Sequence, residues 1–231
     1  MHGPMGTKHK TRRNHDVKKL QVALDLFSTE DALRVLEQVG DYVDIIELGT
    51  PLVIAEGARV VSTVKEKYPD KIVFADIKVM DGGSEVPQSV VKAGCDMFSV
   101  LAAASNNTLR AAIDYGHEKG RMVLVDMCSV ADMEKRGKEI EAFKPDYICC
   151  HVGYDIQATG INPVEELHRL RDVNIPKAIA GGIKLETFRE AVNSEAEDII
   201  SGGGIYKQKD MQGTVMKMRE ILNEYNRSHK G

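Results

Sequence analysis

Three charged side chains, Asp76, Lys78 and Asp81, follow the apolar run 72–74 at close spacing. Side chains alternate between the two faces of an extended strand, so Asp76 and Lys78 are predicted to point the same way, with Asp81 just beyond them in a glycine-containing loop. A lysine held between carboxylates can stabilise an oxyanion, an enolate or an intermediate bound to a metal ion. Taken alone, the same residues would also fit a salt bridge at the end of a strand.

Further ionisable residues lie at or near the ends of other apolar segments, namely Asp25, Glu47, Asp126 and His151. The carboxylates of Glu47 and Asp76 suit Mg²⁺, a hard cation that prefers oxygen ligands and keeps some of its water. His151 can transfer a proton near neutral pH. A single histidine is also common as a hydrogen-bonded structural group, so the position of His151 decides between the two interpretations.

Two glycine clusters, Gly181-Gly182 and Gly202-Gly203-Gly204, follow the last two apolar runs of the chain. Backbone without side chains lets amide groups approach phosphate oxygens closely. In barrels of alternating strands and helices, the loops after strands seven and eight often bind phosphate. The clusters therefore predict a phosphorylated small molecule as the ligand, with ordinary turn glycines as the alternative.

The segments that carry these residues alternate with helical segments along the whole chain. Most of the strand-like segments are nearly continuous apolar runs, as is typical of parallel strands covered on both faces. Eight strand–helix units predict a single-domain α/β protein, a (β/α)₈ or TIM barrel. An open doubly wound sheet is the alternative, but no G-x-G-x-x-G motif follows the first strand. The predicted strands cover 20–26, 42–48, 71–77, 97–102, 121–127, 147–152, 177–180 and 198–201.

The helices are predicted from caps, apolar periodicity and breakers. One continuous helix is expected from Pro51, which suits a helix start, to about Lys67. Others are expected at 85–93 and 130–143. Because active sites of such barrels lie at the carboxyl ends of the strands, we expect the ionisable residues and the glycine clusters to meet there.

Composition restricts the classes of function. No apolar run approaches the ~18 residues that a membrane helix needs, and residues 1–19 lack the apolar centre of a signal peptide. The four cysteines include no C-x-x-C pair, which favours reduced thiols and a cytoplasmic protein. Residues 1–19 form a basic extension, predicted to be disordered or a cloning remnant, and 20–231 form the barrel. The barrel is acidic, which argues against nucleic acid as a partner.

The residues described so far resemble the orotidine-monophosphate-decarboxylase suprafamily, which shares the (β/α)₈ barrel and the motif D-x-K-x-x-D, here at 76–81. Within it, the chain is similar to the branch of 3-hexulose-6-phosphate synthases. The resemblance runs from about Leu20 to the end of the barrel and rests on the segments 24–25, 46–51, 75–81, 125–127, 151–158 and 180–184.

The resemblance implies a Mg²⁺-dependent, reversible aldol condensation of D-ribulose 5-phosphate with formaldehyde to D-arabino-hex-3-ulose 6-phosphate. It implies Glu47 and Asp76 as the metal ligands, Lys78 and Asp81 at the substrate, and His151 as the group that takes or gives the proton at the reacting carbon. Together, Asp76, Lys78, Asp81 and His151 form the implied catalytic set. The residues implied to bind the substrate are Asp25, Gly181, Gly182, Gly202 and Gly203.

The resemblance also implies a homodimer with shared active sites, in which Asp81 reaches the site of the other subunit. A sister branch, 3-keto-L-gulonate-6-phosphate decarboxylase, makes the same type of enediolate by losing CO₂, and has an arginine after the strand-eight glycine. This chain has Gly203 and Gly204 there, which favours the synthase. A third alternative is a sugar-phosphate-binding barrel without catalytic activity, which need not keep the implied catalytic set.

Overall fold

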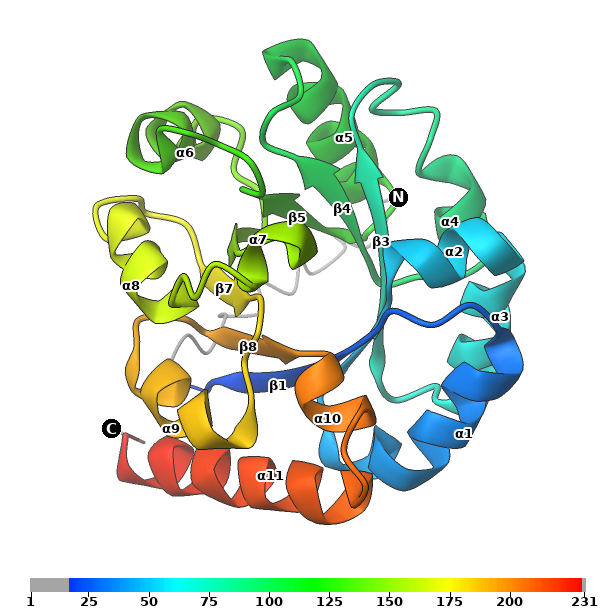
Figure 1. Ribbon diagram of the computed structural model, residues 1–231. Helices are drawn as coiled ribbons and strands as arrows, with labels where there is room; N and C mark the ends of the chain where they lie inside the picture. Colours follow the sequence, from blue (N-terminus) through cyan, green and yellow to red (C-terminus); the bar gives the residue numbers. More distant parts are fainter. Residues whose placement is uncertain (1–16, 230–231) are drawn as a thin grey trace, which may run out of the picture.

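The computed structural model describes residues 17–229, which form a closed barrel of eight parallel strands in the order β1 to β8 (Figure 1). The barrel closes where β1 pairs with β8, with Lys19 opposite Asp198. The prediction of a TIM barrel is confirmed, and the open sheet is excluded. The strands are β1 (Lys19–Leu24), β2 (Ile45–Leu48), β3 (Ile72–Val79), β4 (Met97–Leu101), β5 (Met122–Asp126), β6 (Tyr147–His151), β7 (Lys177–Ala180) and β8 (Asp198–Ser201).

Helices surround the strands on the outside of the barrel (Figure 1). In α1, for example, the Ser28 side chain accepts a hydrogen bond from the backbone N–H of Asp31, and the apolar face is buried. The helices are α1 (Thr29–Val39), η1 (Gly40–Tyr42), α2 (Thr50–Glu56), α3 (Arg59–Lys67), α4 (Gln88–Lys92), α5 (Asn106–Glu118), α6 (Met133–Glu141), α7 (Tyr154–Gln157), α8 (Pro163–Leu167), η2 (His168–Leu170), α9 (Leu185–Asn193), α10 (Gly203–Tyr206) and α11 (Met211–Ser228). Within residues 17–229, no helix is both long and apolar enough to cross a membrane.

Two hydrophobic layers stabilise the barrel. The larger layer lies between the strands and the helices, and the smaller one fills the barrel interior. The inner layer includes Ile45, Phe74, Met97 and Leu124, all at most 2% exposed. This inner layer fills the barrel beneath the carboxyl ends of the strands. The polar side chains at those ends therefore pack against apolar residues on the side that faces the barrel interior.

The structure differs from the sequence prediction at several boundaries. The helix expected from Pro51 to Lys67 is two helices, because Gly57 has a φ of +67°, a left-handed conformation that ends α2. The short α10 was not predicted. Lys18 is buried and donates to the carbonyl oxygen of Ala196 at 2.7 Å, so the end of the predicted basic extension belongs to the barrel. The rest of that extension, residues 1–16, lies outside the described residues.

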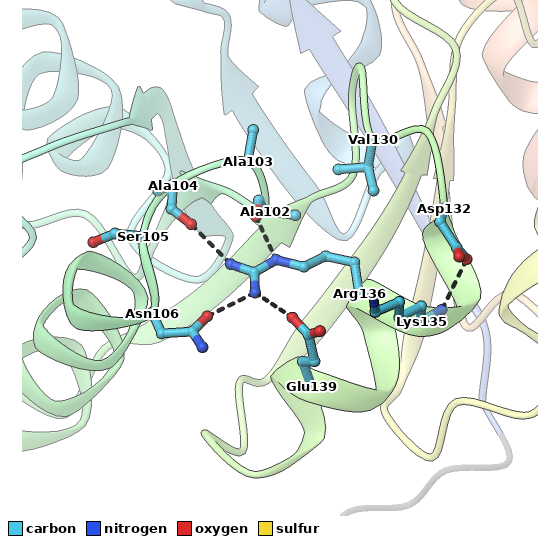
Figure 2. A pocket seen from close by; sticks show the side chains of 10 residues that line it. All are labelled: Ala102, Ala103, Ala104, Ser105, Asn106, Val130, Asp132, Lys135, Arg136 and Glu139. Atoms are coloured by element: carbon cyan, nitrogen blue, oxygen red, sulfur yellow. Dashed lines mark hydrogen bonds and ion pairs between the residues drawn. The ribbon is translucent and has the colours of Figure 1, made fainter.

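Arg136 of α6 holds the loop between β4 and α5 in place (Figure 2). Its guanidinium donates to the carbonyl oxygens of Ala102 and Ala104, each at 2.8 Å, and to the side chains of Asn106 and Glu139. These residues line a cavity of about 490 Å³ that contains none of the predicted site residues. Because all three guanidinium nitrogens already have partners, we assign Arg136 a structural role.

Candidate active site

A cavity of about 1170 Å³ opens at the carboxyl ends of the strands. It brings together nearly all of the site residues that were predicted from the sequence. Its walls include Asp25, Glu47, Asp76, Lys78, Asp126, His151, Gly181, Gly182, Gly202, Gly203 and Gly204. The expected convergence of these residues is therefore present in the structure.

Asp81 is the predicted site residue that lies elsewhere. It is exposed, in the loop after β3, and does not line this cavity. Its neighbours in the loop, Met80 and Val86, expose 53% and 47% of their surface. Asp81 therefore contributes nothing to the cavity of its own chain, and its predicted role across a dimer interface stays a prediction.

Asp76 and Lys78 meet because β3 is irregular at this point. The pairing of β3 with β4 shifts register between Ala75 and Val79, and Lys78 has a φ of +44°. The ammonium of Lys78 lies 2.7 Å from Oδ2 of Asp76. The predicted meeting is thus observed, but a left-handed residue produces it, and simple alternation along an extended strand does not.

Ser99 of β4 supports this irregularity. The backbone N–H of Lys78 donates to Oγ of Ser99 at 2.9 Å, and Oγ donates to Oδ1 of Asp76 at 2.7 Å. Thr50 donates to the other carboxylate oxygen of Asp76 at 2.8 Å. Asp76 is only 6% exposed. Its orientation is therefore fixed by hydrogen bonds from Ser99 of β4 and from Thr50, the first residue of α2.

Asp126 connects Lys78 with His151. Its Oδ2 lies 3.1 Å from Nζ of Lys78 and 2.9 Å from Nδ1 of His151. Oδ1 accepts a hydrogen bond from the backbone N–H of Cys128 at 2.8 Å. A carboxylate can only accept hydrogen bonds, so His151 must carry a proton on Nδ1. This leaves Nε2 of His151 as the ring nitrogen available to exchange a proton with a ligand in the cavity.

The charges of this cluster support one another. Burial acts to raise the pKa of Asp126, but the His151 ring and then the Lys78 ammonium outweigh it and lower the pKa to about 2. Burial acts to lower the pKa of Lys78, but Asp76 and Asp126 reverse the effect and raise it. Burial likewise acts to lower the pKa of His151, but Asp126 outweighs burial and raises it. Asp126 is therefore ionised and Lys78 charged at neutral pH.

Acidic side chains crowd the other side of the cavity. Burial, then Asp76 and Asp25, raise the pKa of Glu47 well above its usual value. Burial, then Asp76, also raise the pKa of Asp25. Gln21, fully buried on β1, donates through Nε2 to Oε2 of Glu47 at 2.6 Å. Buried carboxylates that repel one another form a place where a cation is stabilising.

The donor set fits Mg²⁺ in composition. Among the described residues, no group of three acidic, histidine or cysteine side chains could hold a metal ion. Mg²⁺ does not require such a group, because it commonly takes one or two carboxylates and completes its shell with water and substrate oxygens. Glu47 and Asp76 supply two carboxylates beside the cavity, so the arrangement matches that pattern.

The glycine clusters line the cavity for two different reasons. Gly181 has a φ of +107°, and a Cβ there would lie 2.3 Å from the carbonyl oxygen of Val152, so packing alone requires glycine. Gly203 has a common backbone conformation and meets only a flexible lysine side chain. Close packing against backbone therefore explains the glycine at position 181. It does not explain the glycine at position 203.

Sequence reasoning missed the polar residues that position the charged ones. Gln21, Thr50 and Ser99 lie inside apolar runs or at their ends, and none is ionisable. For Gln21 a signal was present in the sequence. It is a polar residue inside an apolar strand, and a buried amide side chain needs a hydrogen-bond partner. For Ser99 no local signal existed, because its partners come from the neighbouring strand β3.

Comparison with known proteins identifies the family. Residues 18–218 match the Orotidine 5'-phosphate decarboxylase / HUMPS family. The chain belongs to this family. A relative named 3-hexulose-6-phosphate synthase, from Bacillus subtilis, is 41% identical over 206 residues, which cover 88% of this chain and 98% of the relative.

Solved structures agree with this assignment. A 3-hexulose-6-phosphate synthase from Salmonella typhimurium is 36% identical, with a TM-score of 0.87 over 90% of this chain and 99% of that one. A 3-keto-L-gulonate-6-phosphate decarboxylase from Vibrio cholerae is 28% identical, with a TM-score of 0.80 over the same shares. The chain is thus an enzyme of the 3-hexulose-6-phosphate synthase group, an aldehyde-lyase, and that prediction is confirmed.

Proposed function

We propose that the enzyme catalyses the Mg²⁺-dependent, reversible aldol condensation of D-ribulose 5-phosphate with formaldehyde to D-arabino-hex-3-ulose 6-phosphate. One observation carries the proposal, namely the chain of contacts from Asp76 through Lys78 and Asp126 to His151 in one cavity. It sets a proton-transfer group beside charges that suit an enediolate. The greater identity to relatives named as synthases than to the Vibrio decarboxylase supports the choice of reaction.

His151 moves the proton in this scheme. Nε2 of its neutral ring takes a proton from C1 of ribulose 5-phosphate, and the electron pair of that C–H bond becomes the enediolate. The enediolate carbon then forms a bond to the carbon of formaldehyde, and the oxygen of formaldehyde takes up a proton from the imidazolium. Asp126 accepts a hydrogen bond from Nδ1 throughout and stabilises the imidazolium that forms.

Lys78 and the carboxylates handle the negative charge. The ammonium of Lys78, fixed by Asp76 and Asp126, lies where it can stabilise developing charge on the sugar oxygens. Glu47 and Asp76 would hold Mg²⁺, which when bound would supply further positive charge to those oxygens. The glycine loops after β7 and β8 would bind the phosphate group through backbone N–H groups.

The proposed dimer explains the position of Asp81. The loop after β3 exposes Met80 and Val86 next to an acid that has no function in its own cavity, as expected of a segment covered by a second subunit. Mixing inactive Lys78→Ala and Asp81→Ala subunits would test this arrangement. If sites are shared, mixed dimers contain one site with both native residues and recover part of the activity. Recovery of none, despite subunit exchange, would refute the shared site.

The reaction itself is tested by incubating the protein with Mg²⁺, ribulose 5-phosphate and formaldehyde and following formaldehyde loss, with an EDTA control. Loss that depends on ribulose 5-phosphate and stops with EDTA is expected. No loss, with CO₂ released from 3-keto-L-gulonate 6-phosphate instead, would refute the proposal in favour of the decarboxylase. Loss that EDTA does not affect would refute the dependence on Mg²⁺.

A further inference from the structure

Lys207, which follows α10, lines the active-site cavity beside the glycine loops and has no role in the scheme above. Backbone N–H groups of glycine loops donate hydrogen bonds but carry no net charge. A phosphate monoester carries close to two negative charges at neutral pH. A lysine that lines the cavity beside the loops, as Lys207 and Lys184 do, can supply the positive charge that the backbone lacks.

The side chain of Lys207 lies over Gly203. A Cβ built at Gly203 would lie 3.1 Å from Cδ and 3.3 Å from Cε of Lys207. The stem of the lysine thus packs closely over Gly203, and a side chain at position 203 would displace it by a few tenths of an ångström.

Two aromatic rings flank the ammonium group. Nζ of Lys207 lies 5.6 Å from the ring centroid of Tyr154 and 5.8 Å from that of Tyr206. A cation is attracted to the face of an aromatic ring at such distances. Tyr154 follows β6 and Tyr206 follows β8, so the rings hold the ammonium between two loops of the cavity mouth.

The charge of Lys207 is available to a ligand. Among residues 17–229, no carboxylate forms a salt bridge with it, whereas Lys78 is paired with both Asp76 and Asp126. Its field nevertheless reaches into the cavity, because Lys207 is one of the cations that oppose the raised pKa of Asp25.

We propose that Lys207 binds the phosphate group of the sugar-phosphate substrate, with its stem over Gly203 and its ammonium held by Tyr154 and Tyr206. This inference rests on the proposed function, which supplies the phosphorylated substrate. Since the phosphate takes no part in the bond changes, Lys207 contributes equally to the ground state and the transition state. Its loss should therefore raise KM and leave kcat nearly unchanged.

The test compares Lys207→Ala and Lys207→Arg with Lys209→Ala, which removes an exposed lysine two residues away that does not line the cavity. Binding is measured by calorimetry with D-ribitol 5-phosphate, which lacks the carbonyl group and cannot react. Lys207→Ala should weaken this binding by about tenfold or more, as expected for a hydrogen bond between charged groups. KM for ribulose 5-phosphate should rise by a similar factor. Lys207→Arg should retain most of the affinity, and Lys209→Ala all of it.

The outcomes separate this inference from the proposed function. A native enzyme that neither binds D-ribitol 5-phosphate nor consumes formaldehyde would refute the proposed function, and the inference with it. A native enzyme that does both, with Lys207→Ala unchanged in affinity and KM, would refute only the role of Lys207. An equal loss in Lys209→Ala, or a loss confined to Lys184→Ala, the other lysine beside these loops, would also refute it.

Discussion

Replacing Asp126 by asparagine tests the reasoning about His151 most directly. Asparagine keeps the shape and can still accept the hydrogen bond from the backbone of Cys128 through its oxygen. Its NH₂ group then faces Nδ1 of His151, where the native carboxylate accepts. The ring must now accept at Nδ1 and carry its proton on Nε2. The nitrogen that faces the cavity can no longer act as a base.

The expected loss follows from this change of tautomer. General acid–base catalysis by a positioned side chain contributes about 10²–10⁴-fold, so kcat should fall by about that factor. Asp126 also raises the pKa of His151. In the native enzyme, activity should therefore fall as the pH drops through a pKa above 6.5, because the basic form is lost. In Asp126→Asn the remaining activity should persist to lower pH, since that pKa falls.

The assay is formaldehyde consumption across the pH range, with ¹⁵N NMR of His151 as an independent measurement. Asp70→Asn, at an exposed carboxylate, is the matched control and should change neither. The NMR spectrum should show the proton on Nδ1 in the native enzyme and on Nε2 in Asp126→Asn. A variant with kcat within about threefold of native, or with an unchanged tautomer, would refute the assigned role of Asp126.

Three further predictions concern other buried residues, namely Asp198, Gln21 and Ser99. Burial raises the pKa of Asp198 from 3.8 to about 8, so the folded protein holds a proton that the unfolded chain has released. Stability should then fall by up to about 1.4 kcal/mol per pH unit between these values, and Asp198→Asn should abolish that fall in thermal melts from pH 5 to 9. Gln21→Leu should weaken Mn²⁺ binding, measured by electron paramagnetic resonance, because Glu47 loses its 2.6 Å hydrogen bond; unchanged affinity would refute a positioning role. Ser99→Ala should lower kcat by about tenfold by removing the bond that orients Asp76, whereas an unchanged kcat would show that Thr50 suffices.

The architecture could be predicted because the strand and helix periods are local. Most strands are apolar runs, as is typical of strands that are buried on both faces of a sheet. A chain of eight such strands alternating with helices can adopt only a few topologies. The break between α2 and α3 was missed because Gly57 stands in a segment that is otherwise helical in composition. A glycine can end a helix through such a left-handed conformation, but the helical pattern on both sides of Gly57 favoured one continuous helix.

The charged residues of the site could be predicted by the same route, since the barrel brings strand ends together wherever they lie in the sequence. The residues that orient them could not. Gln21 and Ser99 act across strands, on Glu47 and Asp76, and their types are common in strands of any function. Lys207 lies in a loop after a short helix, where no periodicity points to it.

The irregular end of β3 was not predicted from the sequence, and it determines where the ammonium of Lys78 lies. Along a regular strand, residues two apart are separated by about 6.6 Å, so Lys78 would extend beyond Asp76 toward the cavity mouth. Lys78 instead adopts a left-handed backbone conformation within β3, at a cost of about 1–3 kcal/mol for a strained residue. The hydrogen bond from its backbone to Ser99 and the ion pairs with Asp76 and Asp126 offset that cost. The strained backbone of Lys78 is therefore maintained by the contacts that it makes possible. Replacing Lys78 by glycine would relieve the backbone but leave Asp76 and Asp126 without their shared cation, so activity should be lost even where the fold is kept.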